Sequence, residues 1–361
     1  MKPILLLFLI FTTFLHAQTT TADGFALPQP GKTFVFPRDH GSHPEFRTEW
    51  WYVTGHLDGK DGRRFGFQVT FFRQARREDD KTLHLHLAHA ALMDAQTGQF
   101  LHEERLNREG WDAASSDTTL AVHNSNWSLK LDESTQHLHI AATVKNQALL
   151  QLDLEPLKPL VVFGKDGVSR KGTSQTAASH YLTWPRLKTS GTIKLAAHEH
   201  PVTGEAWMDH EFSSSQLDEG QVGWDWAALQ LKDGREIMVY RMRRKDGTLD
   251  AASTLAVVER DGKVRHLASN AFTWEVLSTW KSPRNDAQYP NHVRLRFEGE
   301  SLELKPLAQD QEQDGGITRL PYWEGACDVL DSQGKITGRA FLELAGYAGD
   351  LAGHLTPSAG K

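Results

Sequence analysis

The chain contains two similar segments that lie a domain's length apart. Residues 49–57 have the sequence EWWYVTGHL, and residues 223–231 have the sequence GWDWAALQL. Each is followed by an Asp-Gly-Arg turn, at 61–63 and 233–235, and then by a strand-like run. The first tryptophans are 174 residues apart, whereas solenoid repeats recur every 20–50 residues or so. The sequence therefore predicts two similar domains in tandem, each opened by a tryptophan-bearing β-hairpin.

Alternation of apolar and polar residues dominates the rest of the chain. Clear examples are residues 64–69, 82–87, 137–140, 292–297 and 301–305, and glycine-containing turn dipeptides separate such runs. This pattern is typical of antiparallel sheets with one wet face, and many short strands joined by glycine turns indicate barrels or sandwiches. We expect an all-β fold with two tandem antiparallel barrels, the first domain spanning 30–213 and the second 214–355.

The first 17 residues have the pattern of an export signal. Lys2 supplies a positive charge, residues 4–15 are mostly apolar, and Ala17 is a small residue suited to cleavage. Such a run is too short for a membrane span of about 20 residues, and no other stretch is apolar enough for a transmembrane segment. We expect residues 1–17 to be removed and the mature chain to be exported, periplasmic or secreted, from a bacterium. A buried N-terminal helix or strand is the alternative.

Composition limits the compartment and the class of partner. Cys327 is the single cysteine, so no intramolecular disulfide can form, and an exported chain of this kind fits a bacterial periplasm. The formal net charge of −6, with both signs interspersed, argues against nucleic acid as a partner. Eleven tryptophans exceed ordinary usage and suit the walls of a ligand site, although they also fill β cores.

The densest group of ionisable side chains lies in residues 204–215, with the sequence GEAWMDHEFSSS. In a strand, Trp207, Asp209 and Glu211 share one face and His210 lies on the other. Buried charge is costly unless it is paired or used, and two close carboxylates can raise one pKa and create a general acid. The alternative is a strand end whose carboxylates bind backbone or arginine groups at the domain junction.

A second candidate is the segment 43–52, with the sequence HPEFRTEWWY. Glu49 stands beside two tryptophans and a tyrosine, which suggests a charged group in an aromatic ligand wall. The alternative is a structural pair of Glu49 with Arg47 or with the backbone that closes one end of the barrel. We expect Trp50 to be structural.

The sequence indicates no metal and no cofactor. The His-x-His pairs His84/His86 and His137/His139 are compatible with zinc or copper, but two ligands do not make a site, and a solvent-facing position is the favoured interpretation. Nucleophile-elbow, phosphate-loop, dinucleotide-binding and zinc-protease motifs are missing from the sequence.

Residues 49–57, 204–212 and 223–226 together resemble the AttH-like and carotenoid 1,2-hydratase (hydroxyneurosporene synthase) family, and the resemblance extends from about residue 36 to 351. It implies two lipocalin-like barrels in tandem. Members of that family include hydratases that add water to an isoprenoid double bond, relatives that act on plant phenolics or polyketides, and proteins without a known activity.

The resemblance suggests a cofactor-independent hydratase that binds a hydrophobic, isoprenoid- or lipid-like small molecule. Hydrating an alkene requires an acid that protonates carbon, followed by capture of the cation by water. We assign Asp209 or Glu211 as the acid, His210 as a proton shuttle and Asp225 as the group that orients water. The expected ligand-binding residues are Glu49, Trp51, Tyr52, Tyr181, Trp207, Trp224, Trp226 and Tyr240.

A non-catalytic carrier or sensor of a hydrophobic ligand is the main alternative, and a secreted hydrolase is the third. The environment of the carboxylate pair distinguishes the first two. A pair directed into an apolar cavity without an arginine or lysine partner favours the enzyme, whereas a pair bound to Arg186, Arg241 or Arg243 favours the carrier. The cavity is expected within one barrel or between the two.

Overall fold

The computed structural model describes residues 18–79, 81–349 and 351, so the expected export signal at 1–17 lies outside the described residues. Within them the fold is built almost entirely from antiparallel strands, with one short 3-10 helix, η1 (Arg38–His40). The prediction of an all-β fold is confirmed. No helix in the described ranges is long and apolar enough to cross a membrane.

Thirteen strands form the first sheet, in the order β4-β3-β2-β1-β13-β12-β9-β8-β7-β6-β5, with β10 and β11 pairing with β12. Their bounds are β1 (Thr48–Gly59), β2 (Arg64–Glu78), β3 (Lys81–Asp94), β4 (Gln99–Arg108), β5 (Ala113–Ser115), β6 (Ala121–Asn124), β7 (Trp127–Asp132), β8 (His137–Val144), β9 (Ala148–Pro156), β10 (Val161–Phe163), β11 (Ser169–Arg170), β12 (Ala178–Leu195) and β13 (His198–Ser215). The sheet curls until side chains of β4 reach β6 and β8, with Asn107 donating to Asn124 at 2.7 Å and Arg105 to Thr143 at 3.0 Å.

Ten strands form the second sheet, in the order β17-β16-β15-β14-β23-β22-β20-β19-β18, with β21 pairing with β22. Their bounds are β14 (Gln221–Leu231), β15 (Glu236–Arg244), β16 (Thr254–Val258), β17 (Val264–Ala268), β18 (Phe272–Lys281), β19 (Gln288–Phe297), β20 (Glu300–Pro306), β21 (Glu312–Gln313), β22 (Tyr322–Leu330) and β23 (Ile336–Leu344). The two sheets are separated in sequence by the link between Ser215 and Gln221.

Each curled sheet encloses its own hydrophobic core, because alternate residues of each strand point inward. The first core includes Trp51, Val53, Phe65, Phe67, Val69, Phe71, Leu129, Ile140, Leu152, Leu187 and Met208. The second includes Leu229, Ile237, Val239, Leu255, Val257, Tyr289, Val293, Leu304, Trp323, Cys327 and Leu342. The sequence-based alternation therefore produces two lipocalin-like barrels rather than one continuous sandwich.

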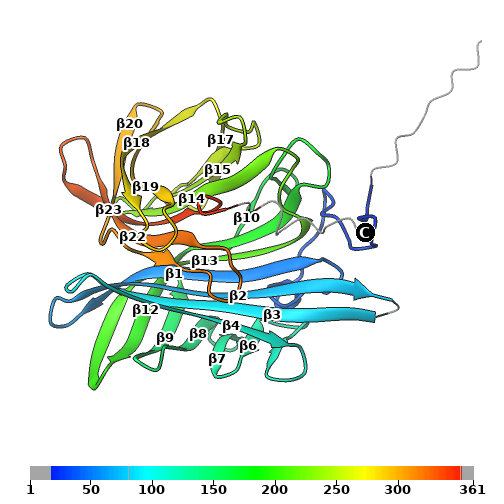
Figure 1. Cartoon of the computed structure of the whole chain (residues 1–361), viewed down its shortest axis with the longest axis horizontal. Coiled ribbons are helices and arrows are strands. Elements are labelled where there is room, and N and C mark those ends of the chain that lie inside the picture. The colour runs from blue at the N-terminus through cyan, green and yellow to red at the C-terminus, as the bar shows by residue number, and fades with distance from the viewer. Residues whose placement is uncertain (1–17, 80, 350, 352–361) are drawn as a thin grey trace, which may run out of the picture.

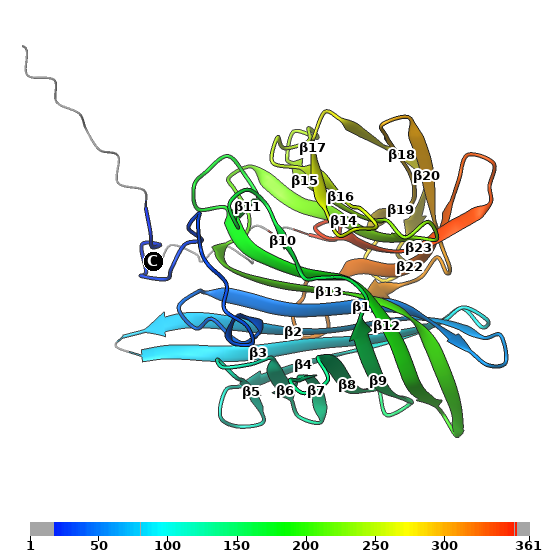
Figure 2. The same ribbon diagram turned by 180° about the vertical axis from the view of Figure 1, so that it is seen from behind.

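The barrels pack back to back through their outer faces, with β22 and β23 lying along β1 and β2 (Figures 1 and 2). A third apolar cluster fills this contact and contains Tyr52, Tyr181, Trp207, Trp226, Met238, Tyr240, Met242 and Phe341. Polar contacts fix the two barrels relative to each other. For example, Arg339 binds Asp58 through two contacts of 2.7 Å, and Gln230 donates to the carbonyl of Ala206 at 2.9 Å.

The repeated tryptophan segments form equivalent hairpins, β1–β2 and β14–β15. In each hairpin a buried carboxylate lies directly opposite an arginine: Glu49 is paired with Arg73, and Asp225 with Arg241. Each hairpin of the repeat thus contains a buried ion pair, although Glu49 precedes the first tryptophan of its segment and Asp225 follows the first tryptophan of the other.

Candidate functional site

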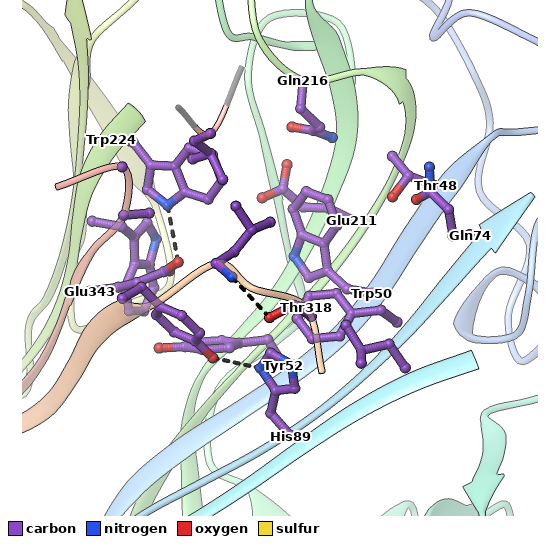
Figure 3. Close-up of a pocket in the computed structure, with 18 of the residues that line it drawn as sticks. Thr48, Trp50, Tyr52, Gln74, His89, Glu211, Gln216, Trp224, Thr318 and Glu343 are labelled. Carbon is purple, nitrogen blue, oxygen red and sulfur yellow. Dashed lines mark hydrogen bonds between the residues drawn. The ribbon is translucent and has the colours of Figure 1, made fainter. Parts of the chain in front are cut away.

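A cavity of about 430 Å³ lies between the two barrels (Figure 3). Small-molecule sites typically have volumes of about 300–1,000 Å³. The wall is mostly apolar; the first barrel contributes Trp50, Tyr52, Phe72, Leu85, Leu87 and Leu106, and the second contributes Trp224, Trp226, Tyr240, Leu320 and Tyr322. Four carboxylates and one lysine interrupt this wall, namely Asp209, Glu211, Glu324, Glu343 and Lys171. The cavity is therefore apolar with an acidic region.

Strand alternation decides which aromatic residues reach the cavity. On β1, Trp50 and Tyr52 point toward the second barrel, whereas Trp51 points into the first core and donates its indole N–H to the carbonyl of His40 at 3.0 Å. Trp50 lines the cavity and Trp51 does not, the reverse of the sequence-based assignment. Because successive side chains of a strand point to opposite faces, only one of the two adjacent tryptophans can reach the cavity.

The second barrel presents the equivalent positions of its own hairpin. Trp224 and Trp226 on β14 line the cavity, and Tyr240 on β15 joins them. Figure 3 shows Trp224 and Glu343 on one side of the cavity, across from Trp50, Thr48 and Gln74. The two copies of the repeat therefore face each other and form opposite walls of one cavity.

Asp209 on β13 lies at the cavity and is held by three donors. The hydroxyl of Thr183 and the indole N–H of Trp207 donate to Oδ1 at 2.6 and 2.7 Å, and the Tyr181 hydroxyl donates to Oδ2 at 2.7 Å. The indole of Trp226 donates in turn to the Tyr181 oxygen at 3.1 Å. This network fixes the orientation of the carboxyl group.

Burial raises the pKa of Asp209 to about 7, and the nearby Glu211 acts in the same direction, although the hydrogen bonds from Thr183 and Tyr181 favour the ionised form. Among the described residues, Asp209 has no salt bridge to arginine or lysine. A carboxyl group poised near neutrality in an apolar cavity can act as a general acid.

Glu211, two residues further along β13, has a different environment. Its Oε2 atom lies 2.8 Å from Nζ of Lys171 and also accepts a hydrogen bond from Ser179. The Lys171 ammonium sits over the rings of Tyr181 and Tyr240, at 4.6 and 4.2 Å from their centroids. The predicted carboxylate pair is thus split into one group without a basic partner and one group bound to a buried lysine.

Arg186, Arg241 and Arg243, which the sequence offered as alternative partners of this pair, bind other groups. Arg186 binds Glu205 and Glu236. Lys171 lies in a polar loop, residues 165–176, where composition alone gave no sign that one lysine side chain would be buried.

His210 and Glu49 lie on the opposite side of β13 and β1, outside the cavity. Five donor groups surround the Glu49 carboxylate: the Ser42 hydroxyl at 3.1 Å, the His43 backbone N–H and Nδ1 both at 2.8 Å, Nε of Arg73 at 3.1 Å and Nε2 of His210 at 2.9 Å. His210 is therefore not placed to shuttle protons in the cavity, and Glu49 is not placed to touch a ligand there.

The Glu49 cluster is a buried ion network. Burial alone would raise the pKa of Glu49, but the hydrogen bonds from His210 and His43, with the charge of Arg73, hold it well below its usual range. The side-chain ligand atoms of His43, Glu49 and His210 lie within 4.8 Å of one another, a spacing that a metal ion could share. The five donor groups and the Arg73 charge satisfy the Glu49 carboxylate, whereas Nδ1 of His210 has no hydrogen-bond partner in the described structure.

Asp225 is also outside the cavity. It points into the second barrel, where it binds Arg241 and Arg243 and accepts a hydrogen bond from the Tyr347 hydroxyl at 2.8 Å. These partners leave it no role in orienting water between the barrels. Trp207 is 2 % exposed and lies behind the wall, with its ring centroid 6.2 Å from that of Trp226, and its indole N–H donates to Asp209.

Glu324 on β22 and Glu343 on β23 are site residues that the sequence analysis missed. They lie directly opposite each other in the register of the two strands. The Tyr52 hydroxyl donates to Oε1 of Glu324 at 2.5 Å, and the indole of Trp224 donates to Oε1 of Glu343 at 3.1 Å. The sequence signal for Glu343 is its position between two leucines in an alternating run.

The two glutamates resist ionisation. Burial, together with the adjacent Glu343, raises the pKa of Glu324 well above its usual range. Burial, opposed by the Trp224 hydrogen bond but reinforced by Asp209 and Glu211, raises the pKa of Glu343 to about 7.

One wall of the cavity is a loop of the second barrel that is fastened to the first. The backbone N–H groups of Ile317 and Thr318 donate to Glu104 on β4 at 2.7 and 3.2 Å, and residues 317–321 line the cavity. The Tyr322 hydroxyl lies 2.7 Å from Nδ1 of His89. Both barrels are therefore needed to complete the cavity.

Fold and site together define a tandem of two lipocalin-like barrels with an aromatic, acidic cavity between them. The model of the AttH-like family matches residues 27–347, and the chain therefore belongs to that family. This confirms the family resemblance drawn from the tryptophan and Asp-His-Glu segments.

Two solved structures are similar over nearly the whole chain. A protein assigned to AttH from Nitrosomonas europaea has 34% identity and a TM-score of 0.82, and the match covers 90% of this chain and 100% of that one. Kievitone hydratase from Nectria haematococca has 13% identity and a TM-score of 0.67, and the match covers 92% and 97% of the two chains. At that identity, the second likeness shows the fold alone.

The chain is also similar to a curated relative, the ceramide-binding protein svf1 of Aspergillus fumigatus. The identity is 22% over 238 residues, which is 65% of this chain and 56% of the relative. The chain thus matches little more than half of that relative's length.

Replacing Glu49 by glutamine should destabilise the first barrel by about 3–5 kcal/mol, because it leaves Arg73 buried without its counter-charge. Denaturant unfolding measures this. Glu45→Gln, at an exposed position four residues earlier, is the control and should change stability by no more than about 0.5 kcal/mol. Equal stability of the two variants would show that the network contributes little.

Asp209 should make the stability of the protein depend on pH near neutrality. Its pKa is about 7 in the fold against an ordinary value of 3.8, so its contribution is complete below about pH 4 and is lost as the pH rises through 7. Asp209→Asn is permanently neutral and removes this loss. Between about pH 5 and 8 the variant should therefore lose about 2 kcal/mol less than wild type.

The measurement is chemical unfolding at both pH values. Asp246→Asn is the matched control, because Asp246 is exposed and its hydrogen bonds from Thr248 hold its pKa below the ordinary value, outside this window. If Asp209→Asn and Asp246→Asn both follow the wild-type pH dependence, Asp209 does not titrate near neutrality.

Proposed function

We propose that this protein binds a hydrophobic small molecule between its two barrels and adds water to a carbon–carbon double bond of that molecule, with Asp209 as the acid. The observation that carries the proposal is the Asp209 environment. Its carboxyl group faces a mostly apolar cavity, has no arginine or lysine salt bridge among the described residues, and has a pKa of about 7. The fold it shares with kievitone hydratase is consistent with this chemistry.

The hydrogen bond between Asp209 and Tyr181 suggests how the proton reaches the ligand. When Asp209 is protonated, its O–H donates to the Tyr181 oxygen, and the tyrosine hydroxyl hydrogen is free to point into the cavity. Proton transfer along this pair forms a C–H bond from the alkene π electrons and leaves a cation on the neighbouring carbon. Water then forms the C–O bond, and its proton returns to Asp209, so the net reaction is alkene plus water giving alcohol.

The aromatic wall suits the cation in this step. The rings of Trp224, Trp226 and Tyr240 line the cavity, and aromatic faces attract cations by about 2 kcal/mol or more when water is excluded. The carboxyl oxygens of Glu324 and Glu343 also line this cavity, and each group adds negative potential there when it ionises. The reaction requires only water as a second reactant.

A non-catalytic carrier is the second candidate, and the Lys171–Glu211 pair favours it. One of the two predicted carboxylates is held by a buried lysine, as a structural brace would be. The curated relative svf1 is named as ceramide-binding, and the apolar wall suits such a ligand. A hydrolase is less well supported, because the Ser214 hydroxyl donates to the carbonyl of Ala26 and no described hydrogen bond joins a serine of the cavity to a histidine.

The test of catalysis is mass spectrometry of the purified mature protein incubated with apolar extracts of the producing cells. Wild type should convert one extracted species to a product heavier by the mass of water. Asp209→Asn and Tyr181→Phe should slow this conversion by about a hundredfold or more, the usual contribution of a general acid. Asp246→Asn should convert the species at the wild-type rate.

Two outcomes would change the assignment. If wild type and Asp209→Asn retain the same unmodified ligand, the carrier is the correct function. If both convert the ligand at one rate, Asp209 is not the acid.

We also propose that the mature protein is exported. The support is the charged, apolar and small-residue pattern of residues 1–17. Expression of the full chain in a Gram-negative host should yield periplasmic protein whose N-terminus, determined by mass spectrometry, begins close after Ala17. Protein with an intact N-terminus in the cytoplasm would contradict this.

A further inference from the structure

We infer that the ligand of this cavity carries a protonated amine, which binds at the facing carboxyl groups of Glu324 and Glu343. The inference rests on the proposed function only in so far as the cavity takes an amphipathic small molecule. It applies whether that molecule is hydrated or merely carried.

The first argument is the pairing of the two glutamates. Side chains directly opposite on neighbouring antiparallel strands lie about 4.5–5.5 Å apart at Cβ, so ionisation of both glutamates without a counter-ion would destabilise the sheet. Neither Glu324 nor Glu343 has a salt bridge to a basic group within the described ranges. The protein therefore supplies no counter-ion for these two carboxyl groups, and a cationic ligand that enters the cavity could supply it.

The second argument is a free oxygen atom. Glu324 is 1 % exposed, its Oε1 accepts the Tyr52 hydrogen bond, and its Oε2 has no hydrogen-bond partner in the described structure. Glu324 nevertheless lines the cavity. A buried polar atom without a partner is costly, and an ammonium N–H entering the cavity would satisfy it.

The third argument is the surrounding aromatic rings. Tyr52, Trp224, Trp226 and Tyr322 line the cavity beside the two glutamates. Aromatic faces combined with carboxylates are the usual means by which proteins hold alkylammonium groups. Leucine and phenylalanine side chains, among them Phe72, Leu85 and Leu87, line another part of the wall and suit a hydrocarbon portion attached to the amine.

The same cavity already holds one ammonium group in this way. Lys171 places its Nζ atom over the rings of Tyr181 and Tyr240 and 2.8 Å from Glu211. The protein thus uses two rings and a carboxylate to bind an internal amine. The region of Glu324 and Glu343 offers rings and two carboxyl groups but no internal amine.

The charges that face this region leave it acidic. Lys171 is occupied by Glu211, so Asp209, Glu324 and Glu343 have no basic partner of their own. Two arginines also line the cavity, but Arg47 binds Asp23. The other, Arg319, is exposed to solvent. His89, the histidine of the wall, contacts the Tyr322 hydroxyl, and burial lowers its pKa to about 4, so it adds no positive charge at neutrality.

Calorimetric binding of decylamine and decanol at about pH 8 tests the inference, because the two probes differ mainly in the charged head group. Wild type should bind decylamine at least about tenfold more tightly than decanol. The Glu324→Gln, Glu343→Gln double variant should lose this preference and bind decanol as wild type does. Glu303→Gln on β20, outside the cavity, is the matched control and should keep the preference.

The outcomes separate the two proposals. Equal affinity of wild type for the two probes, or an unchanged preference in the double variant, overturns the amine inference and leaves the hydrophobic site in place. If neither probe binds wild type, the proposal of a hydrophobic ligand site is wrong, and the amine inference is wrong with it. The double variant should also show a higher melting temperature than wild type at this pH, because the raised pKa values of both glutamates make unfolding more favourable as the pH rises and glutamine does not titrate. This measurement reports the folding of the variant independently of any ligand.

Discussion

The structure depends on one constraint, the alternation of side chains along two central strands of the first barrel. Along β13, Asp209 and Glu211 face the cavity while His210 faces the buried Glu49 network. Along β1, Trp50 and Tyr52 face the cavity while Trp51 fills the core. The segments that look like one dense functional motif are therefore two motifs back to back. The residues on one face stabilise the first barrel, and the residues on the other face line the cavity between the barrels.

The position of the cavity explains why both repeats are present. Each barrel encloses its own hydrophobic core, and the cavity wall between the barrels is assembled from equivalent hairpins, with Trp224 and Trp226 facing Trp50 and Tyr52. The loop fastened by Glu104 closes one side. The internal duplication thus supplies two similar surfaces that become different once they face each other, one carrying Asp209 and the other the glutamate pair.

The sequence was sufficient for the fold, because period-two patterning and glycine turns are local signals and the repeat gave the number of barrels. It also gave Asp209 and most of the aromatic wall. The sequence was insufficient where the position of a side chain depends on contacts with residues far away in the chain. Asp225 was assigned to the site from its neighbours, yet Arg241 and Arg243 bind it inside the second barrel. Lys171 and Glu324 were missed because their burial follows from the packing of one barrel on the other.

The cavity wall belongs to neither hydrophobic core, and this has a consequence for how such proteins diversify. A substitution at Trp50, Tyr240 or Glu343 changes the surface offered to a ligand but leaves both barrel interiors and their buried ion networks untouched. Selection can therefore alter ligand preference without repacking the core of either barrel. A protein with two such barrels can bind unrelated small molecules after substitutions that are confined to the cavity wall between the barrels.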